Sequence, residues 1–359
     1  MRIAIIGGGN IGTLMAVEFA SRGHAVAMYA SHPEQWSLHI ESFDADDAPV
    51  CSGDLALATD DLRAAVDGAD MVWVTYPTFM LESLAEHLLP MLEPRQWLGV
   101  VPGNDAEFIF AAHVARGGVL FGLQRVHSVA RIKERGRSVY MLGRRTGGLH
   151  VAALPSAYTP QVAAAVEKLF DLPCECLPTY LAETLTPSNP ILHTCRIFSM
   201  FHDWAPGVSY DRNFLFYEEW TDAASQLLIE CDAELQSVCR ELERRLGCDL
   251  SGVTSLLDHY QNSDAASMTA KITSIPGFKG LASPMREDGS GRWVPDFSSR
   301  YFKADFPYGM KAIKDIAGLV QVPVPRIGEV YAWYRRVSGD SVCFEGVPRS
   351  LDGLAALYV

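Results

Sequence analysis

The sequence predicts an α/β protein with a doubly wound parallel sheet in its N-terminal part and a second, mostly α-helical domain. Three observations carry this prediction. The chain opens with an apolar run at Arg2–Ile6 that leads through a glycine-rich turn into a stretch of helical spacing. Apolar runs of strand length then alternate with stretches of helical spacing, which is typical of a parallel sheet. From Pro187 onward, helical spacing dominates.

The glycine-rich turn has the spacing of a dinucleotide-binding motif. Gly7, Gly9 and Gly12 follow the first apolar run, and Gly23 leads into a second one. In such a βαβ unit the first glycine permits the tight turn, the second lets a pyrophosphate approach the backbone, and the third lets the helix pack on the strand. We therefore predict a Rossmann-type domain that binds its cofactor at Gly7, Gly9, Asn10, Ile11 and Gly12.

The other expected elements follow from the same periodicities. Strands are expected at Met71–Tyr76, Trp97–Val101, Val119–Leu123, Ser138–Leu142 and Leu149–Ala153. Helices are expected at Asp60–Asp70, Thr78–Leu92, Pro160–Phe170, Phe214–Leu246, Val253–His259, Lys311–Val320 and Arg326–Val337. The stretch Lys271–Arg300 is rich in Ser, Gly and Pro, so we expect a long loop that covers a site. We place the dinucleotide-binding domain at residues 1–182 and the helical substrate domain at 183–359.

Length, charge and cysteine usage restrict the class of protein. The 359 residues suit two domains, and 48% hydrophobic with 20% charged residues indicate a globular protein. The net charge of −13 excludes nucleic acid and anionic membranes as expected partners, because both would repel the chain. No apolar run of about eighteen residues is present to span a bilayer, and the first strand leaves no room for a signal peptide. The eight cysteines are scattered, with Cys174 and Cys176 expected in a loop, so we expect free thiols, no metal site and a cytoplasmic location.

The end of the second apolar run bears on which dinucleotide is bound. NAD-selective proteins place an Asp or Glu there to hold the ribose 2′-hydroxyl. This chain has Ser31 and His32 instead, whose side chains can donate hydrogen bonds to a 2′-phosphate, so NADP is favoured over NAD. Alternatively, Ser31 caps a helix that starts at Pro33. The nicotinamide is expected beyond the carboxyl ends of the strands, near Tyr76, Pro77, Gly103 and Asn104.

The second half of the chain contains a candidate acid–base pair. His193 is expected one turn into a helix whose start is marked by Pro187 and Pro190. Arg300 and Asp305 follow at the end of the Ser-, Gly- and Pro-rich stretch. When a histidine and an aspartate pack together, the carboxylate fixes the imidazole tautomer and raises its basicity, as general acid–base chemistry requires.

Three segments of the chain resemble the octopine/nopaline (opine) dehydrogenases. They are the GGGNxG turn at Gly7–Gly12, the NPxxH segment at Asn189–His193 and the RYxxxDxPYG segment at Arg300–Gly309, with a VPxP step at Val322–Pro325. The resemblance implies the same two-domain fold and NAD(P)H-dependent reductive condensation of an amino acid with a 2-oxo acid. It also implies His193 as the acid/base, Asp305 as its partner and Arg300 as a ligand of a substrate carboxylate.

The chain departs from the family pattern at two positions. Ala304 stands where a glutamate often precedes the aspartate, which leaves the side-chain contacts there open. Ser31 replaces an acid of NADH-using members, which favours NADPH. The expected partners are therefore small molecules, an amino acid and a 2-oxo acid, and a homodimer is left open. The stretch from residue 271 to 300 is expected to close over the reactants.

Two other functions fit part of this pattern. A ketopantoate-type or other 2-oxo acid reductase would share the architecture without needing an amine. Such reductases commonly use a lysine as acid, and the NPxxH and DxPYG segments contain none, which leaves Lys271 and Lys279 as candidates. A non-catalytic NADP redox sensor would bind the cofactor without turnover, and the presence of both His193 and Asp305 counts against it.

Overall fold

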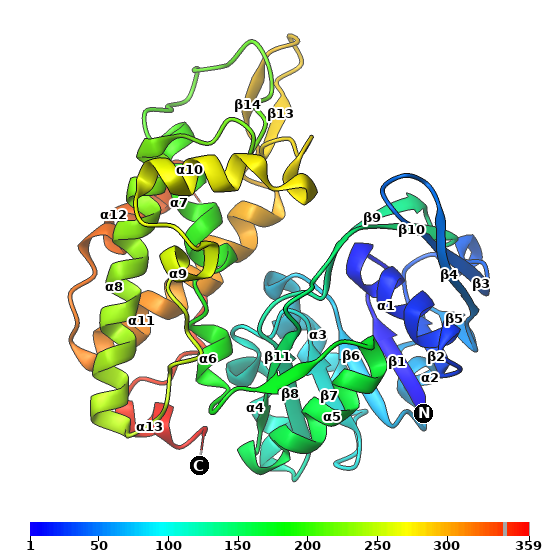
Figure 1. Ribbon diagram of the computed structural model, residues 1–359. Helices are drawn as coiled ribbons and strands as arrows, with labels where there is room; N and C mark the ends of the chain where they lie inside the picture. Colours follow the sequence, from blue (N-terminus) through cyan, green and yellow to red (C-terminus); the bar gives the residue numbers. More distant parts are fainter. Residues whose placement is uncertain (340–342, 359) are drawn as a thin grey trace. The chain divides into compact units, whose positions relative to one another are not determined.

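The computed structural model describes residues 1–339 and 343–358, which belong to two compact units. The first unit comprises Met1–Thr184 together with the chain from Ala356 onward, and the second comprises Leu185–Ala355. A central sheet organises the first unit, whereas packed helices organise the second (Figure 1).

An eight-stranded sheet forms the centre of the first unit, in the order β12-β11-β8-β7-β6-β1-β2-β5. Its strands are β1 (Arg2–Ile6), β2 (Ala25–Tyr29), β5 (Leu57–Thr59), β6 (Met71–Val74), β7 (Trp97–Val100), β8 (Val119–Leu123), β11 (Leu149–Leu154) and β12 (Cys174–Cys176). Strand β11 runs antiparallel to β8, and the other neighbouring pairs are parallel. The predicted doubly wound sheet is thus confirmed, while the loop expected at Cys174 and Cys176 is wrong because these residues pair with β11.

Helices connect these strands in the expected alternation. They are α1 (Asn10–Ser21), α2 (Leu62–Val66), α3 (Leu81–Leu88), α4 (Ala106–Ala115), α5 (Thr159–Phe170) and α6 (Leu181–Thr184). The helix expected over Asp60–Asp70 is shorter in the structure, where α2 spans only Leu62–Val66. The Asp61 side chain accepts hydrogen bonds from the backbone N–H groups of Arg63 and Ala64, which sets the start of α2. Asp67 is extended and Gly68 has a φ of +65°, so the helix ends after Val66.

A second sheet of four strands packs against α1, in the order β4-β3-β10-β9. Its strands are β3 (His39–Phe43), β4 (Pro49–Asp54), β9 (Ser128–Glu134) and β10 (Ser138–Arg144). The strand expected at Ser138–Leu142 is present as β10, but it lies in this sheet and not in the central one. Strands β3, β4 and β9 were not predicted, because polar residues interrupt their apolar alternation.

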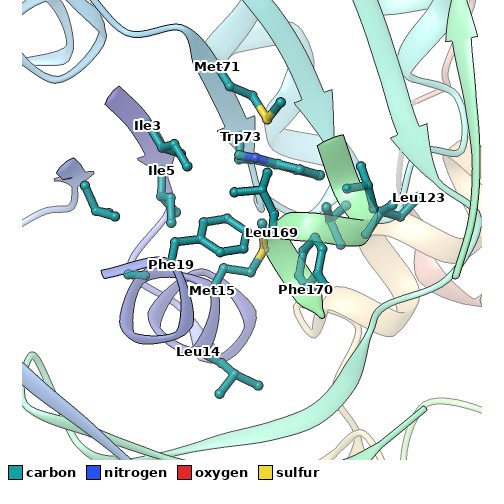
Figure 2. Close-up of a cluster of buried hydrophobic side chains, with 14 of the residues drawn as sticks. Ile3, Ile5, Leu14, Met15, Phe19, Met71, Trp73, Leu123, Leu169 and Phe170 are labelled. Atoms are coloured by element: carbon teal, nitrogen blue, oxygen red, sulfur yellow. The ribbon is translucent and has the colours of Figure 1, made fainter. Parts of the chain in front are cut away.

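Trp73 of β6 lies in the middle of the first unit's core (Figure 2). Its ring meets Phe121 edge-on at a centroid distance of 4.7 Å and Phe170 at 5.8 Å. Phe19 of α1 and Phe170 of α5 are 5.1 Å apart, and all four rings are fully buried. Burial of each ring stabilises the fold by roughly 1.5–3 kcal/mol, so this cluster holds α1 and α5 against the sheet.

The long helix α8 (Asp222–Leu246) is the centre of the second unit, where it packs against α7, α10, α11 and α12. The other helices are α7 (Asn189–Phe201), α9 (Leu256–Tyr260), α10 (Ala265–Ser274), the π-helix η5 (Tyr301–Met310), α11 (Lys311–Val320), α12 (Pro325–Ser338) and α13 (Leu351–Ala355). The predicted mostly helical second domain is confirmed by these elements. Within the described part of the chain, no helix combines the length and the apolar character needed to cross a membrane.

The structure corrects two expectations for the second unit, the start of its long helix and the long loop over Lys271–Arg300. The helix expected over Phe214–Leu246 begins only at Asp222, because the Thr221 hydroxyl caps it by accepting from the Ala224 N–H. The residues before it pair with another segment: Phe216 N–H donates to Leu281 O, and Ser283 N–H donates to Phe214 O.

The stretch Lys271–Arg300 is not the long loop that its composition suggests. It contains the end of α10, a short 3₁₀ turn (Pro276–Phe278) and a hairpin of β13 (Met285–Glu287) and β14 (Trp293–Pro295). The Gly and Ser residues between the two strands form the connection of the hairpin, where Gly289 and Gly291 have positive φ values.

Candidate functional site

The glycine turn of the first unit leaves the start of α1 open to a ligand. Gly7 has a φ of +125°, which favours glycine, and a Cβ at Gly12 would overlap the carbonyl oxygen of Gly7. A Cβ at Gly9, in contrast, would have no atom within 4 Å. Gly9 is also the N-cap of α1, and no side chain caps this helix start. Uncapped backbone N–H groups at a helix N-terminus bind phosphate, so the turn fits the pyrophosphate of a dinucleotide.

Asn10 and Ile11 are engaged with the protein rather than directed to a ligand. The Asn10 Oδ1 atom accepts a hydrogen bond of 2.9 Å from the Ile132 N–H of β9. Ile11 packs against the hydrophobic core of the unit. These two residues can therefore bind a cofactor through their backbone N–H groups, while their side chains hold the start of α1 in place.

Ser31 and His32 are both exposed after the end of β2. His32, with a φ of +61°, occupies the N-cap position of a three-residue 3₁₀ turn (Pro33–Gln35), and no side chain caps this turn. The alternative in which Ser31 caps a helix is therefore wrong. The His32 Nδ1 atom lies 3.3 Å from Glu34 Oε1, so a carboxylate pairs with one of the two candidate phosphate donors.

The candidate nicotinamide residues follow adjacent parallel strands. Tyr76 and Pro77 come after β6, while Gly103 and Asn104 come after β7, and β6 pairs directly with β1. The carboxyl ends of these strands share one edge of the sheet with the glycine turn, which is the edge where open α/β sheets bind their ligands. Gly103 is buried, and a Cβ there would overlap Glu183 Oε2.

Buried carboxyl groups cluster next to Gly103 and Asn104, and no sequence pattern had indicated them. Asp105, Glu107 and Glu183 are each at most 1% exposed. Thr184 Oγ1 donates to Glu107 at 2.7 Å, and Tyr358 donates to the same carboxyl at 3.0 Å. Burial raises the pKa of Asp105 to about 7 and that of Glu107 to about 8. A neutral acid needs no counter-ion, so these groups can stay protonated inside the unit.

In the second unit, the structure brings His193 and Asp305 together. His193 lies on α7, one turn after its start, and Asp305 lies on the π-helix η5. The His193 Nδ1 atom is 2.9 Å from Asp305 Oδ2, and the two side chains are only 8% and 13% exposed. The close packing of α7 on η5 depends on Gly309, where a Cβ would overlap Pro190. The carboxylate is thus placed to hold the imidazole in one tautomer, with the proton on Nδ1.

The other ring nitrogen of His193 meets a residue that the sequence did not place at the acid–base pair. The Tyr217 hydroxyl lies 2.9 Å from His193 Nε2. The rings of Phe216 and Tyr301 also surround the imidazole, with centroid distances of 5.5 Å and 4.7 Å. An isolated tyrosine before a helix carries no signal for this contact, because 24 residues separate it from His193.

Arg300 lies at the start of η5, next to this cluster. Its guanidinium group is 5.4 Å from the centre of the Tyr301 ring. The Arg300 residue is exposed, and among residues 1–339 and 343–358 no carboxylate forms an ion pair with it. A guanidinium without a carboxylate partner can bind the carboxylate of a ligand through two parallel hydrogen bonds.

Two regions of the chain match known protein families. Residues 2–101 match the family described as NAD-dependent glycerol-3-phosphate dehydrogenase N-terminus. Residues 176–338 match the family described as NAD/NADP octopine/nopaline dehydrogenase, alpha-helical domain. The first region contains the glycine turn, and the second contains both His193 and Asp305.

Comparison with individual proteins extends this result to nearly the whole chain. The chain is 26% identical to tauropine dehydrogenase of Arabella iricolor over 94% of this chain and 91% of that protein. A structure of octopine dehydrogenase with NADH and L-arginine superposes with a TM-score of 0.81 at 22% identity, covering 100% of this chain and 94% of the other. A ketopantoate reductase from Ralstonia eutropha JMP134 gives a lower TM-score of 0.60 at 16% identity, covering 94% and 99%.

Proposed function

We propose that this chain, whose residues 176–338 match the octopine/nopaline dehydrogenase helical domain, is an NAD(P)-dependent opine dehydrogenase that condenses an amino acid with a 2-oxo acid reductively to an N-(carboxyalkyl)amino acid. The observation that carries this proposal is the buried His193–Asp305 pair within the helical unit. A simple reduction of a carbonyl needs one proton at one oxygen. Condensation requires that protons leave the amine and reach the departing oxygen. One group that acts first as a base and then as an acid can transfer them.

In this proposal, the dinucleotide binds to residues 1–182. The uncapped start of α1 and the open space at Gly9 support phosphate binding there, and Gly7 and Gly12 shape the turn. Tyr76, Pro77, Gly103 and Asn104 would border the nicotinamide, which supplies the hydride to the imine carbon. Residues 183–359 supply His193 as the acid–base group and Arg300 as the residue that binds the substrate carboxylate.

The proposed chemistry of His193 follows from its two hydrogen bonds. Because Asp305 accepts the proton of Nδ1, the neutral imidazole presents a lone pair at Nε2. This nitrogen takes up the proton that the amine loses as it adds to the carbonyl carbon. The resulting imidazolium is stabilised by Asp305 and returns the proton to the oxygen, which gives the carbinolamine hydroxyl. A second proton, lost by the same nitrogen atom of the substrate, passes through His193 to that hydroxyl, which then leaves as water and leaves the imine behind.

Arg300 is proposed to hold the carboxylate of the 2-oxo acid. The net charge of −13 opposes the entry of an anion, so a local guanidinium is needed to compensate. The position of Arg300, one residue before Tyr301 and five before Asp305, supports a clamp next to the acid–base pair.

For the cofactor, we propose a preference for NADPH over NADH. No acid stands at Ser31 or His32 to hold a ribose 2′-hydroxyl, and both exposed side chains can donate to a phosphate.

An initial-rate screen tests the proposed function. NADPH and NADH oxidation are measured with 2-oxo acids crossed against amino acids, and the products are identified by mass spectrometry. We expect oxidation to stay slow with a 2-oxo acid alone and to rise when the correct amino acid is added. Full-rate formation of a 2-hydroxy acid without an amine would favour the reductase interpretation. Tight cofactor binding without turnover on any pair would favour the redox sensor.

The structure lends no support to the lysine acid of the reductase interpretation. Lys271 and Lys279 are both exposed, on α10 and just after the 3₁₀ turn that follows it. His193, in contrast, is buried and oriented by a carboxylate.

A further inference from the structure

Both ring nitrogens of His193 are already engaged inside the second unit. Nδ1 pairs with Asp305, and Nε2 lies 2.9 Å from the Tyr217 hydroxyl. With the Nδ1 proton donated to the carboxylate, Nε2 of the neutral imidazole can only accept, so the Tyr217 hydroxyl donates to it. His193 and Tyr217 are each 6% exposed, so the hydrogen bond between them is shielded from solvent.

The Tyr217 ring is held in place by other aromatic rings. Phe278 stacks on it with a centroid distance of 4.0 Å and an interplanar angle of 15°. Phe216 meets it edge-on at 4.9 Å, and Trp220 lies nearly parallel to it at 6.2 Å. Aromatic pairs of this kind each contribute about 0.5–1.5 kcal/mol beyond the burial of their area. Moving the hydroxyl away from His193 would therefore cost several such contacts at once.

The backbone on either side of Tyr217 is fixed as well. The Phe216 carbonyl accepts a hydrogen bond of 2.8 Å from Arg196 Nε of α7, the helix that carries His193. The Glu218 carboxylate accepts a hydrogen bond of 2.7 Å from the Gly280 N–H. Tyr217 and His193 are thus held to a common frame, so their hydrogen bond is built into the fold.

We propose that Tyr217 is a proton-relay residue, through whose hydroxyl His193 exchanges protons with the substrate. In the base direction, the substrate amine gives its proton to the Tyr217 oxygen while the Tyr217 proton moves to His193 Nε2. In the acid direction, His193 Nε2 returns a proton to Tyr217 while the phenol proton passes to the departing oxygen of the carbinolamine. Two protons move in each step, and Tyr217 ends each step as a neutral phenol. This assignment deepens the proposed function and rests on it.

The surroundings of the hydroxyl suit a relay that remains protonated between steps. Burial raises the pKa of Tyr217 well above its ordinary value, and the nearby Tyr301 and Asp305 act in the same direction. Arg300 is the opposing charge near this phenol. A neutral phenol can donate and accept a hydrogen bond at the same oxygen, which is what a relay requires.

Tyr217→Phe tests the relay, because it removes the hydroxyl and keeps the ring that Phe278 contacts. We expect kcat to fall roughly 10²-fold, with the KM of both substrates changed by less than about threefold. Tyr210→Phe is the matched control, since it removes a hydroxyl in the same unit away from His193, and it is expected to keep its activity. Thermal unfolding and cofactor affinity are measured for both variants to confirm that each is folded.

The number of protons transferred in the rate-limiting step distinguishes a relay from a merely structural hydrogen bond. Rates are measured in mixtures of H₂O and D₂O at saturating substrates. The wild-type protein should give a curved dependence on the deuterium fraction, as two transferred protons require, and Tyr217→Phe should give a linear one. Incorporation of 3-fluorotyrosine at position 217 provides a variant of nearly native size whose more acidic phenol should shift the pH profile of kcat.

Three outcomes would overturn the relay. They are a Tyr217→Phe variant with at least half of the wild-type kcat, a linear deuterium dependence in the wild-type protein, and a pH profile that 3-fluorotyrosine leaves unchanged. Failure of the proposed function is visible separately, in the product that the wild-type protein forms. If that product is a 2-hydroxy acid, the same comparison of kcat and deuterium dependence is made on carbonyl reduction.

Discussion

Gly309 approaches Pro190 so closely that a Cβ at position 309 would overlap the proline ring. This contact joins the π-helix η5, which carries Asp305, to α7, which carries His193. The geometry of the acid–base pair therefore depends on Gly309 as well as on the two side chains that form it.

Gly309→Ala is expected to push η5 away from α7 and to lengthen the His193–Asp305 hydrogen bond. We expect a loss of about 1–3 kcal/mol in the free energy of unfolding and at least a tenfold loss of kcat, with unchanged cofactor affinity. Gly318→Ala is the control, because a Cβ there meets no atom within 4 Å, and its stability should stay equal or rise. Urea unfolding and steady-state kinetics measure both effects. A Gly309→Ala protein with full activity would show that the pair tolerates this displacement.

His193→Ala is expected to lower kcat by roughly 10²–10⁴-fold while cofactor affinity stays near normal, because the residue moves protons and holds no phosphate. Asp305→Asn should fall in the same range, since an amide neither stabilises the imidazolium nor enforces its tautomer. Near-normal turnover of His193→Ala at saturating substrates would show that the acid–base group lies elsewhere.

Ser31→Asp is expected to move cofactor preference from NADPH towards NADH. The new carboxylate can accept from the ribose 2′-hydroxyl and repels a 2′-phosphate. The ratio of kcat/KM for the two cofactors is the measurement, and Ser31→Ala, which removes a donor without adding charge, should give an intermediate ratio. A wild-type protein that already prefers NADH would contradict the proposed preference.

Arg300→Lys is expected to raise the KM of the 2-oxo acid about tenfold or more and to leave NADPH binding unchanged. Lysine offers one point charge where the guanidinium offers two parallel donors. Arg286→Lys, at an exposed position of β13, is the matched control. An unchanged KM in Arg300→Lys would remove this residue from the substrate site.

The buried acids predict how stability depends on pH. Asp105 and Glu107 have folded-state pKa values of about 7 and about 8, raised by burial from ordinary values near 4. The folded protein thus holds protons that the unfolded chain releases, so the stabilisation is complete below about pH 4 and is lost as the pH rises through 7 and 8. We expect the free energy of unfolding to fall between about pH 4 and about pH 8 and to level off above that.

Glu107→Gln identifies the source of that decline. Its amide stays neutral and its oxygen can still accept from Thr184 and Tyr358, so the decline in stability should become shallower. Glu41→Gln, at an exposed position of β3, should leave the pH dependence as it is. If both variants decline as steeply as the wild-type protein, Glu107 is ionised in the folded state.

The parts of the fold that sequence predicted are those set by local patterns. The GxGxxG turn, the apolar runs and the proline-marked start of α7 each depend on residues that are close along the chain. Errors arose where a distant segment decides the local structure. Phe214 and Phe216 have helical spacing with the residues of α8, yet they pair with Ser283 and Leu281 in an extended segment.

The same distinction applies to the candidate site. His193 and Asp305 could be named because each lies in a recognisable segment, and the resemblance supplied their roles. Tyr217 lies in no such segment, so only the folded chain shows its hydroxyl at the imidazole. The buried acids were missed because Asp105, Glu107 and Glu183 look like ordinary surface residues in a sequence, where charge carries no sign of burial.

The hydrogen bond from Tyr358 to Glu107 joins residues 251 positions apart and has a consequence for biosynthesis. A ribosome releases the segments of the central sheet early, so the first unit can form its strands while the helical unit is still being made. Glu107, however, receives its phenol partner only after residue 358 has left the exit tunnel. Until then this buried acid has Thr184 as its side-chain donor, so the interior of the first unit is completed last, by a residue translated after the entire second unit.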